Sequence, residues 1–239
     1  MPGKKSTDVA QIQLLIFDLD GTLWDSTPAL VKAEQELYDW LNQNWPGVTR
    51  KYNRKRWRIM GLELRKRYPD ISHDVTKLRK MALSNAALEA GYYDKAQIIA
   101  EEGFRIFLHW RNKVHIYPDT LPALHALSQQ FTLGSLTNGN ANLGTIGMRD
   151  WFHVNLDPVM LGAAKPDAIC FQAACSYAGV APSEAFHIGD DPLCDVSGAK
   201  EAGLGAIWIN RQKNRYTGSH PPDAEFDNLE PLIRFFMAG

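Results

Sequence analysis

The sequence predicts an α/β protein in which helices flank a parallel sheet and a block of helices interrupts the chain of that sheet. Two observations lead to this prediction. From about Val114 onward, short apolar runs alternate with helix-like segments, which is typical of a parallel sheet covered on both faces. From about Thr27 to Asn112, apolar residues recur at intervals of three and four with little strand signal, which indicates helices alone.

The first strand is predicted at the apolar run Leu14–Phe17, and Asp18 and Asp20 follow it. Side chains of a strand alternate between its faces, so these two carboxylates should point to the same side. Like charges held so close need a shared proton or a cation, and hard oxygen ligands suit Mg²⁺. The alternative is an Asp20-Gly21 hairpin turn between two strands.

The helical block follows directly. Pro28 suits the first turn of a helix, and Thr27 is predicted to cap it. Apolar positions such as Leu30, Leu37 and Leu41 have helical spacing.

Beyond the block, the alternating pattern predicts further elements of the sheet. Gly203 is placed where a helix C-cap belongs, and residues 211–222 are expected to form a polar surface loop. Helices are predicted over residues 118–129, 167–178 and 195–202, and strands over residues 131–136, 185–188 and 206–209.

Polar residues follow the predicted strands, where parallel sheets bind their ligands. They are Thr137 and Asn138, then Lys165 before a proline, then Asp190, Asp191 and Asp195. Each segment also has a plain structural interpretation. Asn138-Gly139 could be a hairpin turn, Lys165 a solvated loop lysine, and the aspartates could cap a helix, which is the expectation for Asp191.

Taken together, these segments resemble the four motifs of the haloacid dehalogenase-like (HAD) hydrolase superfamily, in order, over roughly residues 14–195. The resemblance implies a Rossmann-like catalytic core of residues 1–25 and 113–239. Residues 26–112 would be an inserted, all-helical cap domain that closes over the active site. The matching segments are Asp18-Leu19-Asp20-Gly21-Thr22, Thr137-Asn138, Lys165-Pro166-Asp167 and Ile188 to Asp195.

The resemblance and the chemistry of phosphate esters together predict a Mg²⁺-dependent phosphatase acting on a small phosphomonoester. Asp18 would attack phosphorus to form an aspartyl-phosphate, and Asp20 would be general acid and then general base. Thr137, Asn138 and Lys165 would bind the phosphoryl oxygens. The predicted Mg²⁺ ligands are Asp18, the main-chain carbonyl of Asp20, Asp190 and Asp195.

Other activities of the superfamily remain as alternatives. Its dehalogenases lack the second aspartate, so Asp20 favours a phosphate ester. A sugar phosphomutase shares both aspartates, and a phosphonatase would need a lysine of the cap. A non-catalytic binding module would be indicated by a missing catalytic residue, and every expected one is present.

The cap carries the indications of substrate. The segments His73 to Arg79 and Thr137 to Ala141 look like a bacterial subgroup that acts on flavin mononucleotide and on 5-amino-6-(5-phosphoribitylamino)uracil, a riboflavin precursor. His73, Lys77 and Trp24 are the candidate specificity residues. Trp24, Trp57 and Tyr52 could stack on a flat ring or serve in packing.

Composition excludes several other classes. A net charge of -1 argues against a general nucleic-acid or anionic-membrane binder, and the basic run of residues 50–58 is expected to be a solvated helix face. No stretch approaches a membrane span, and residues 1–10 are too polar for a signal peptide. The scattered Cys170, Cys175 and Cys194 suggest reduced thiols in a cytoplasmic protein. The oligomeric state is not predictable from this chain.

Overall fold

The computed structural model describes residues 11–237, so the expectation about a signal peptide lies outside the described residues. The chain forms two compact units. The first contains the described residues up to Asp25, then Ile116–Asn138 and the residues from Gly147 on. The second contains Ser26–His115 and Gly139–Ile146.

The first unit is built on a six-stranded sheet with the order β5-β4-β1-β6-β7-β8, in which every neighbouring pair is parallel. All four residues of β1 are fully buried, as expected for a strand covered on both faces. The strands are β1 (Leu14–Phe17), β4 (Thr132–Leu136), β5 (Val154–Leu156), β6 (Ala185–Gly189), β7 (Gly205–Ile209) and β8 (Ala224–Phe226).

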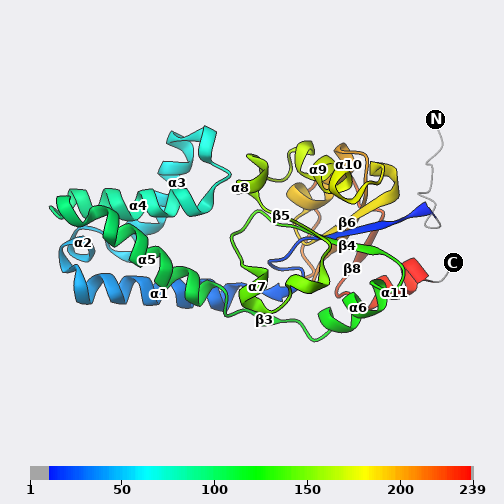
Figure 1. Cartoon of the computed structure of the whole chain (residues 1–239), viewed down its shortest axis with the longest axis horizontal. Helices are drawn as coiled ribbons and strands as arrows, with labels where there is room; N and C mark the ends of the chain where they lie inside the picture. Colours follow the sequence, from blue (N-terminus) through cyan, green and yellow to red (C-terminus); the bar gives the residue numbers. More distant parts are fainter. Residues whose placement is uncertain (1–10, 238–239) are drawn as a thin grey trace. The chain divides into compact units, whose positions relative to one another are not determined.

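Helices cover both faces of this sheet. Figure 1 shows α9 and α10 on one face and α6 and α11 on the other. Leu14 and Ile16 belong to the cluster packed on the first face, while Phe17 lies against Phe152, in keeping with the alternation of strand side chains. The helices are α6 (Thr120–Leu127), α8 (Pro158–Leu161), α9 (Ala168–Ala178), α10 (Gly198–Glu201) and α11 (Glu230–Met237), with short turns η4 (Arg149–Trp151), η5 (Pro182–Glu184) and the π-helical η6 (Pro192–Ser197).

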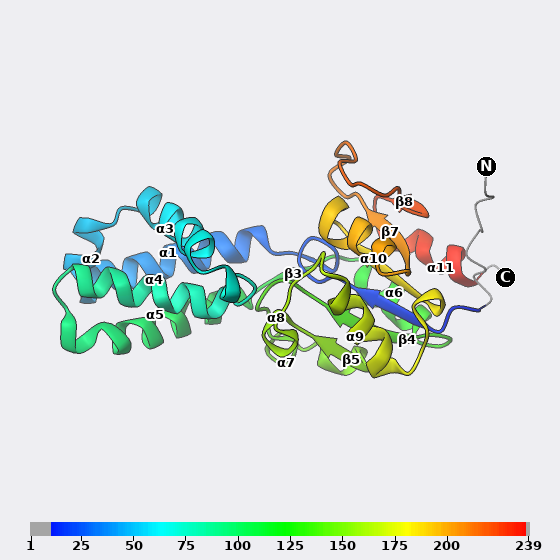
Figure 2. The same ribbon diagram turned by 90° about the horizontal axis from the view of Figure 1, so that it is seen from above.

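The second unit is helical. In it, α5 packs against both α1 and α4 (Figure 2), and buried side chains such as Leu37, Leu83 and Phe107 form their shared core. None of the helices in the described part of the chain is both long and apolar enough to cross a membrane. The helices are α1 (Thr27–Asn44), α2 (Pro46–Lys51), α3 (Arg54–Arg67), α4 (Val75–Glu89), α5 (Ala96–Arg111) and α7 (Leu143–Ile146), with turns η2 (Pro69–Ile71) and η3 (Tyr93–Lys95).

The chain leaves the first unit through β2 (Trp24–Asp25) and returns through β3 (His115–Ile116), which form a separate two-stranded sheet. The division lies close to the predicted one at residues 25 and 112. The difference is that residues 113–115 and 139–146, which we predicted in the core, group with the helical unit. Hydrogen bonds account for the second segment, because Asn142 N–H donates to Asn112 Oδ1 and Asn140 Nδ2 donates to Thr76 Oγ1.

Several local predictions are settled by these elements. Both hairpin alternatives are wrong, because β1 and β4 pair only in parallel within the sheet. Thr27 is not the cap of α1, since the helix includes Thr27 and Ser26 precedes it. Residues 211–222 contain no helix or strand, as predicted, whereas the three-residue strands β5 and β8 were not predicted.

Candidate active site

The predicted core residues follow three neighbouring strands of one sheet. Asp18 follows β1, Thr137 follows β4, and Asp190 follows β6, and the sheet order places β1 between the other two. Parallel strands end at the same edge, so the three segments converge there. Lys165 and Asp195 lie in loops and turns of the same unit.

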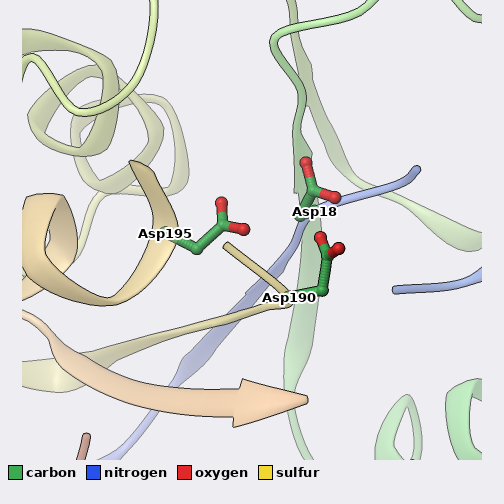
Figure 3. A group of neighbouring side chains, drawn as sticks. All are labelled: Asp18, Asp190 and Asp195. Atoms are coloured by element: carbon green, nitrogen blue, oxygen red, sulfur yellow. The ribbon is translucent and has the colours of Figure 1, made fainter. Parts of the chain in front are cut away.

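Three carboxylates meet at this edge. Asp18, Asp190 and Asp195 each offer an oxygen that lies within 4.8 Å of the others. Figure 3 shows their side chains pointing toward a common space from three separate segments. A set of hard oxygen donors at this separation fits a small divalent cation such as Mg²⁺.

Lys165 lies between two of these carboxylates. Its Nζ donates to Asp18 Oδ1 at 2.7 Å, to Asp195 Oδ1 at 2.6 Å and to the main-chain oxygen of Leu136 at 2.7 Å. An ammonium group has three N–H donors, so all of them are used. The side chain is 2 % exposed, which makes it the reverse of a solvated loop lysine.

Burial and mutual repulsion set the charges of the group. Burial raises the pKa of Asp18 well above its usual value, and Asp195 and Asp190 raise it further against the effect of Lys165. Burial, with Asp195 beside it, raises the pKa of Asp190 to about 7. Both shifts are those that a bound cation would reverse, which is an electrostatic reason to expect one.

Asp195 has the opposite behaviour. Burial alone would raise its pKa, but Lys165 and His187 hold that pKa below its ordinary value. Its Oδ1 lies 2.9 Å from His187 Nε2, and its Oδ2 accepts the main-chain N–H of Asp191 at 2.9 Å. Burial followed by the charge of Lys165 lowers the pKa of His187, which favours the neutral imidazole, and a carboxylate oxygen beside Nε2 can only accept a hydrogen bond from it.

Two glycines allow the carboxylates to come so close to the main chain. A Cβ at Gly189 would lie 2.3 Å from Asp195 Cγ, and a Cβ at Gly21 would lie 2.3 Å from Asp190 Oδ2. Gly21 also has φ +86°, which favours glycine. Any residue with a Cβ at position 21 or 189 would therefore displace the neighbouring aspartate side chain.

Asp191 caps the turn that carries Asp195, as predicted. Its Oδ1 accepts the N–H groups of Leu193 and Cys194 at the start of η6. Asn138 was predicted to bind phosphoryl oxygens, and in the structure its side-chain amide hydrogen-bonds to the main chain of Lys165. Asn138 Oδ1 accepts the Lys165 N–H, and Nδ2 donates to the Lys165 carbonyl, both at 2.8 Å.

The carboxylate of Asp20 lies outside the group of three. Its Oδ1 accepts a hydrogen bond of 2.8 Å from Trp24 Nε1. The interpretation of Trp24 as a specificity residue of the cap is wrong. Trp24 belongs to the first unit and its side chain is fully buried, so it has no face to offer a substrate ring.

The other predicted specificity residues lie in the helical unit. His73 and Lys77 flank the start of α4, where Asp74 caps the helix through the Lys77 N–H. Trp57 and Tyr52 belong to the buried helical cluster and serve in packing, with the Tyr52 hydroxyl bonded to Glu89. The basic run of residues 50–58 forms ion pairs with acids of its own unit, for example Arg54 with Asp39.

Sequence reasoning missed His187 and the contact of Trp24 with Asp20. A signal existed for the first, because His187 is a polar residue inside the apolar strand β6, next to the predicted acidic motif. No spacing rule indicates the second, because it depends on how the turn after Asp20 folds.

Comparison with known proteins agrees with this geometry. Residues 12–203 match the sequence model of the haloacid dehalogenase-like hydrolase family. The chain is 31% identical over 202 residues to the 5-amino-6-(5-phospho-D-ribitylamino)uracil phosphatase YigB of Escherichia coli strain K12, covering 84% of each chain.

Solved structures agree as well. A structure titled 2-haloacid dehalogenase from Pseudomonas syringae pv. Tomato DC3000 is 40% identical, with a TM-score of 0.89 over 95% of this chain and 98% of that one. A HAD phosphatase from Thermococcus onnurineus is 27% identical, with a TM-score of 0.70 over 95% and 99% of the two chains.

Proposed function

Because the chain belongs to the haloacid dehalogenase-like hydrolase family, we propose that it is a phosphatase that hydrolyses small phosphate monoesters with Mg²⁺ as cofactor. The observation that supports this most is the buried group in which Lys165 joins Asp18 and Asp195 beside Asp190. A phosphate monoester carries two negative charges, so its transfer needs a cation, fixed donors and a placed nucleophile.

Asp18 is the proposed nucleophile. Its carboxylate oxygen forms a bond to phosphorus while the bond from phosphorus to the ester oxygen breaks, which gives an aspartyl-phosphate. Asp20 gives a proton to the departing alkoxide, and then takes one from the water that attacks the aspartyl-phosphate. Inorganic phosphate leaves and both carboxyl groups return to their starting states.

The remaining core residues hold this pair in place. Asp18 and Asp190 are the proposed side-chain ligands of Mg²⁺, together with the main-chain carbonyl of Asp20, and the ion would supply positive charge to the phosphoryl oxygens. Asp195, whose two oxygens already accept hydrogen bonds, mainly orients Lys165 and completes the ligand set.

Thr137 and Asn138 are the proposed phosphate-binding residues beside Lys165. The proposed role of Asn138 is to fix the main chain of Lys165 through its side chain and to offer its own N–H to phosphate beside Thr137. Lys165 lowers the charge that the nucleophile presents to the substrate and exchanges a partner for a phosphoryl oxygen when phosphate binds.

The proposed substrates are 5-amino-6-(5-phosphoribitylamino)uracil and flavin mononucleotide. The likeness to YigB supports the first of them. The likeness of residues 73–79 and 137–141 to the bacterial subgroup that acts on these two compounds supports a role for the start of α4. His73 and Lys77 are the proposed contacts with the leaving group. The free thiols of Cys170, Cys175 and Cys194 support a reducing, cytoplasmic location.

Dehalogenation is the second candidate, because a structure 40% identical to this chain is titled as a dehalogenase. Displacing halide from carbon produces no alkoxide to protonate, so it has no use for Asp20. The acidic group of three likewise favours phosphate over a neutral carbon-halogen bond.

The test is release of inorganic phosphate from a panel of monoesters with and without Mg²⁺, and release of halide from 2-chloropropionate. The panel contains both proposed substrates, phosphoserine, phosphoglycolate and sugar phosphates. Asp18→Asn should abolish turnover, while Asp39→Asn, an exposed acid of α1, should leave it unchanged. Halide release without phosphate release would replace the proposal by the second candidate.

A further inference from the structure

We propose that Trp24 is a positioning residue that holds Asp20 in the orientation needed for proton transfer; this rests on the proposed role of Asp20 as general acid and base. The indole Nε1 of Trp24 donates to Asp20 Oδ1 at 2.8 Å. An indole N–H donates and never accepts, so Oδ1 faces it without a proton. The proton that Asp20 delivers is therefore carried by Oδ2.

Trp24 is suited to this role because packing and hydrogen bonds surround it on all sides of the turn. Its side chain is fully buried, and its main chain closes the turn that begins at Asp20. The Gly21 N–H donates to the Trp24 carbonyl, and the Leu23 N–H donates to the Leu19 carbonyl, both at 2.9 Å. Donor and acceptor thus belong to one hydrogen-bonded turn.

Residues far away in sequence fix that turn to the core. The Leu23 carbonyl accepts from Thr120 Oγ1 at 2.7 Å and from the Tyr117 N–H at 3.1 Å. The Thr22 carbonyl accepts from Arg211 Nη2 at 3.0 Å. Main-chain carbonyls on both residues before Trp24 are held from the start of α6 and from the segment after β7.

Arg211 is itself fixed by contacts with Asp119 and Tyr117. Its guanidinium donates to both carboxylate oxygens of Asp119, at 3.2 and 2.8 Å, and lies over the ring of Tyr117 at 3.8 Å. A two-point pair of this kind fixes the plane of the guanidinium. This explains why a loop expected to be only a polar surface contributes a partly buried arginine to the fold.

The consequence concerns the first chemical step. As the phosphorus–oxygen bond breaks, the proton on Asp20 Oδ2 passes to the ester oxygen, and Asp20 is left as a carboxylate. Without the indole N–H the carboxyl group can rotate and present the wrong oxygen. General acid catalysis contributes roughly 10²- to 10⁴-fold in rate, and a misplacement near 1 Å can cost about 10²-fold.

The experiment compares two leaving groups by kcat/KM, which reports the steps through loss of the alcohol. Flavin mononucleotide expels an alkoxide that needs a proton, whereas p-nitrophenyl phosphate expels a stable phenolate. Trp24→Phe should lower kcat/KM for flavin mononucleotide by about 10- to 100-fold and for p-nitrophenyl phosphate by less than about 3-fold. Trp45→Phe is the matched control, because Trp45 Nε1 has no hydrogen-bond partner among the described residues.

Asp20→Asn, measured with the same two substrates, distinguishes failure of the positioning role of Trp24 from failure of the acid role of Asp20. If it loses the alkyl ester selectively and Trp24→Phe loses both equally or neither, the positioning role is overturned and the phosphatase stands. If Asp20→Asn itself shows no selectivity, the acid role fails and the positioning role fails with it.

Should Trp24→Phe not fold, as judged by its melting transition, benzothienylalanine at position 24 keeps the shape of indole and replaces the N–H by sulfur. The same selective loss is expected from this variant. Wild-type selectivity between the two substrates would overturn the proposal.

Discussion

The substitution Lys165→Met removes an ammonium group from between two buried carboxylates. Lys165 Nζ lies 2.7 Å from Asp18 Oδ1 and 2.6 Å from Asp195 Oδ1. Removing one partner of a buried pair costs about 3–5 kcal/mol, because the remaining charge loses its partner without regaining water. In a chain of this size 1 kcal/mol corresponds to about 2–4 °C, so we expect Tm to fall by about 6–20 °C.

Lys200→Met is the matched control. Lys200 Nζ also contacts two carboxylate oxygens, those of Asp223 at 2.8 and 2.7 Å, but the two side chains are 24 % and 27 % exposed. A surface pair contributes about 0.2–1 kcal/mol, so its Tm should fall by less than about 4 °C. Equal losses in the two variants would refute the assignment of a buried, charged group at the centre of the site.

The loss in Lys165→Met should also depend on pH. In the wild type, burial opposes ionisation of Asp195 but Lys165 and His187 keep its pKa low, so its contribution to stability is present above about pH 4 and is lost only in stronger acid. Without Lys165, burial raises that pKa above the unfolded value, and the folded state then loses stability as pH rises. Thermal melts in EDTA should therefore show a larger difference from wild type near pH 8 than near pH 5. A larger difference near pH 5 would contradict this reasoning.

Three further predictions concern the same site and its surroundings. Gly189→Ala places a Cβ 2.3 Å from Asp195 Cγ and should lower kcat about 10²-fold, whereas Gly134→Ala, whose Cβ meets atoms no nearer than 3.6 Å, should leave kcat within a few fold in the same assay. Because the pKa of Asp190 is raised to about 7, its protonated form favours the folded apo protein at low pH and that stabilisation is lost as pH rises through about 7; the gain in Tm on adding MgCl₂ should grow over the same range, and a gain independent of pH would contradict it. Burial raises the pKa of the thiols of Cys170 and Cys175 to about 11 and that of Cys194 to about 12. Ellman's reagent should therefore react with these thiols in urea and scarcely in the native protein.

Much of the core could be predicted because local pattern and fold agree there. The run Leu14–Phe17 is apolar throughout because the strand is buried on both faces. Acidic residues directly after a buried strand are unfavourable for packing, so their presence indicated a functional site. Elements with weak local signals were missed. Strand β8 has three residues and none of them is fully buried, so pairing with β7 rather than propensity determines it.

The residues that the structure brings together at the sheet edge, Asp18, Lys165, Asp190 and Asp195, could be named from the sequence, but their contacts could not. Spacing cannot show that the Asn138 amide faces the main chain of Lys165, or that Trp24 lies against Asp20, because both contacts depend on loop conformation. The prediction of Trp24 as a specificity residue failed for the same reason, since the burial of its indole depends on how the turn after Asp20 folds. The domain boundary at residues 139–146 also depends on contacts, namely the hydrogen bonds of Asn140 and Asn142.

The parallel registry of β1 has a consequence for how the chain is made. Leu14 pairs with Thr132 on one side and with Ala185 on the other. The central strand therefore cannot form its sheet hydrogen bonds until more than a hundred further residues have been synthesised. The helical unit is nearly continuous in sequence, from Ser26 to His115, and its contacts can form while the ribosome is still producing the rest of the sheet. At about 5–20 residues per second, the apolar strand that precedes Asp18 stays without its neighbours for several seconds or longer, and during that time its four apolar side chains cannot be buried in the sheet.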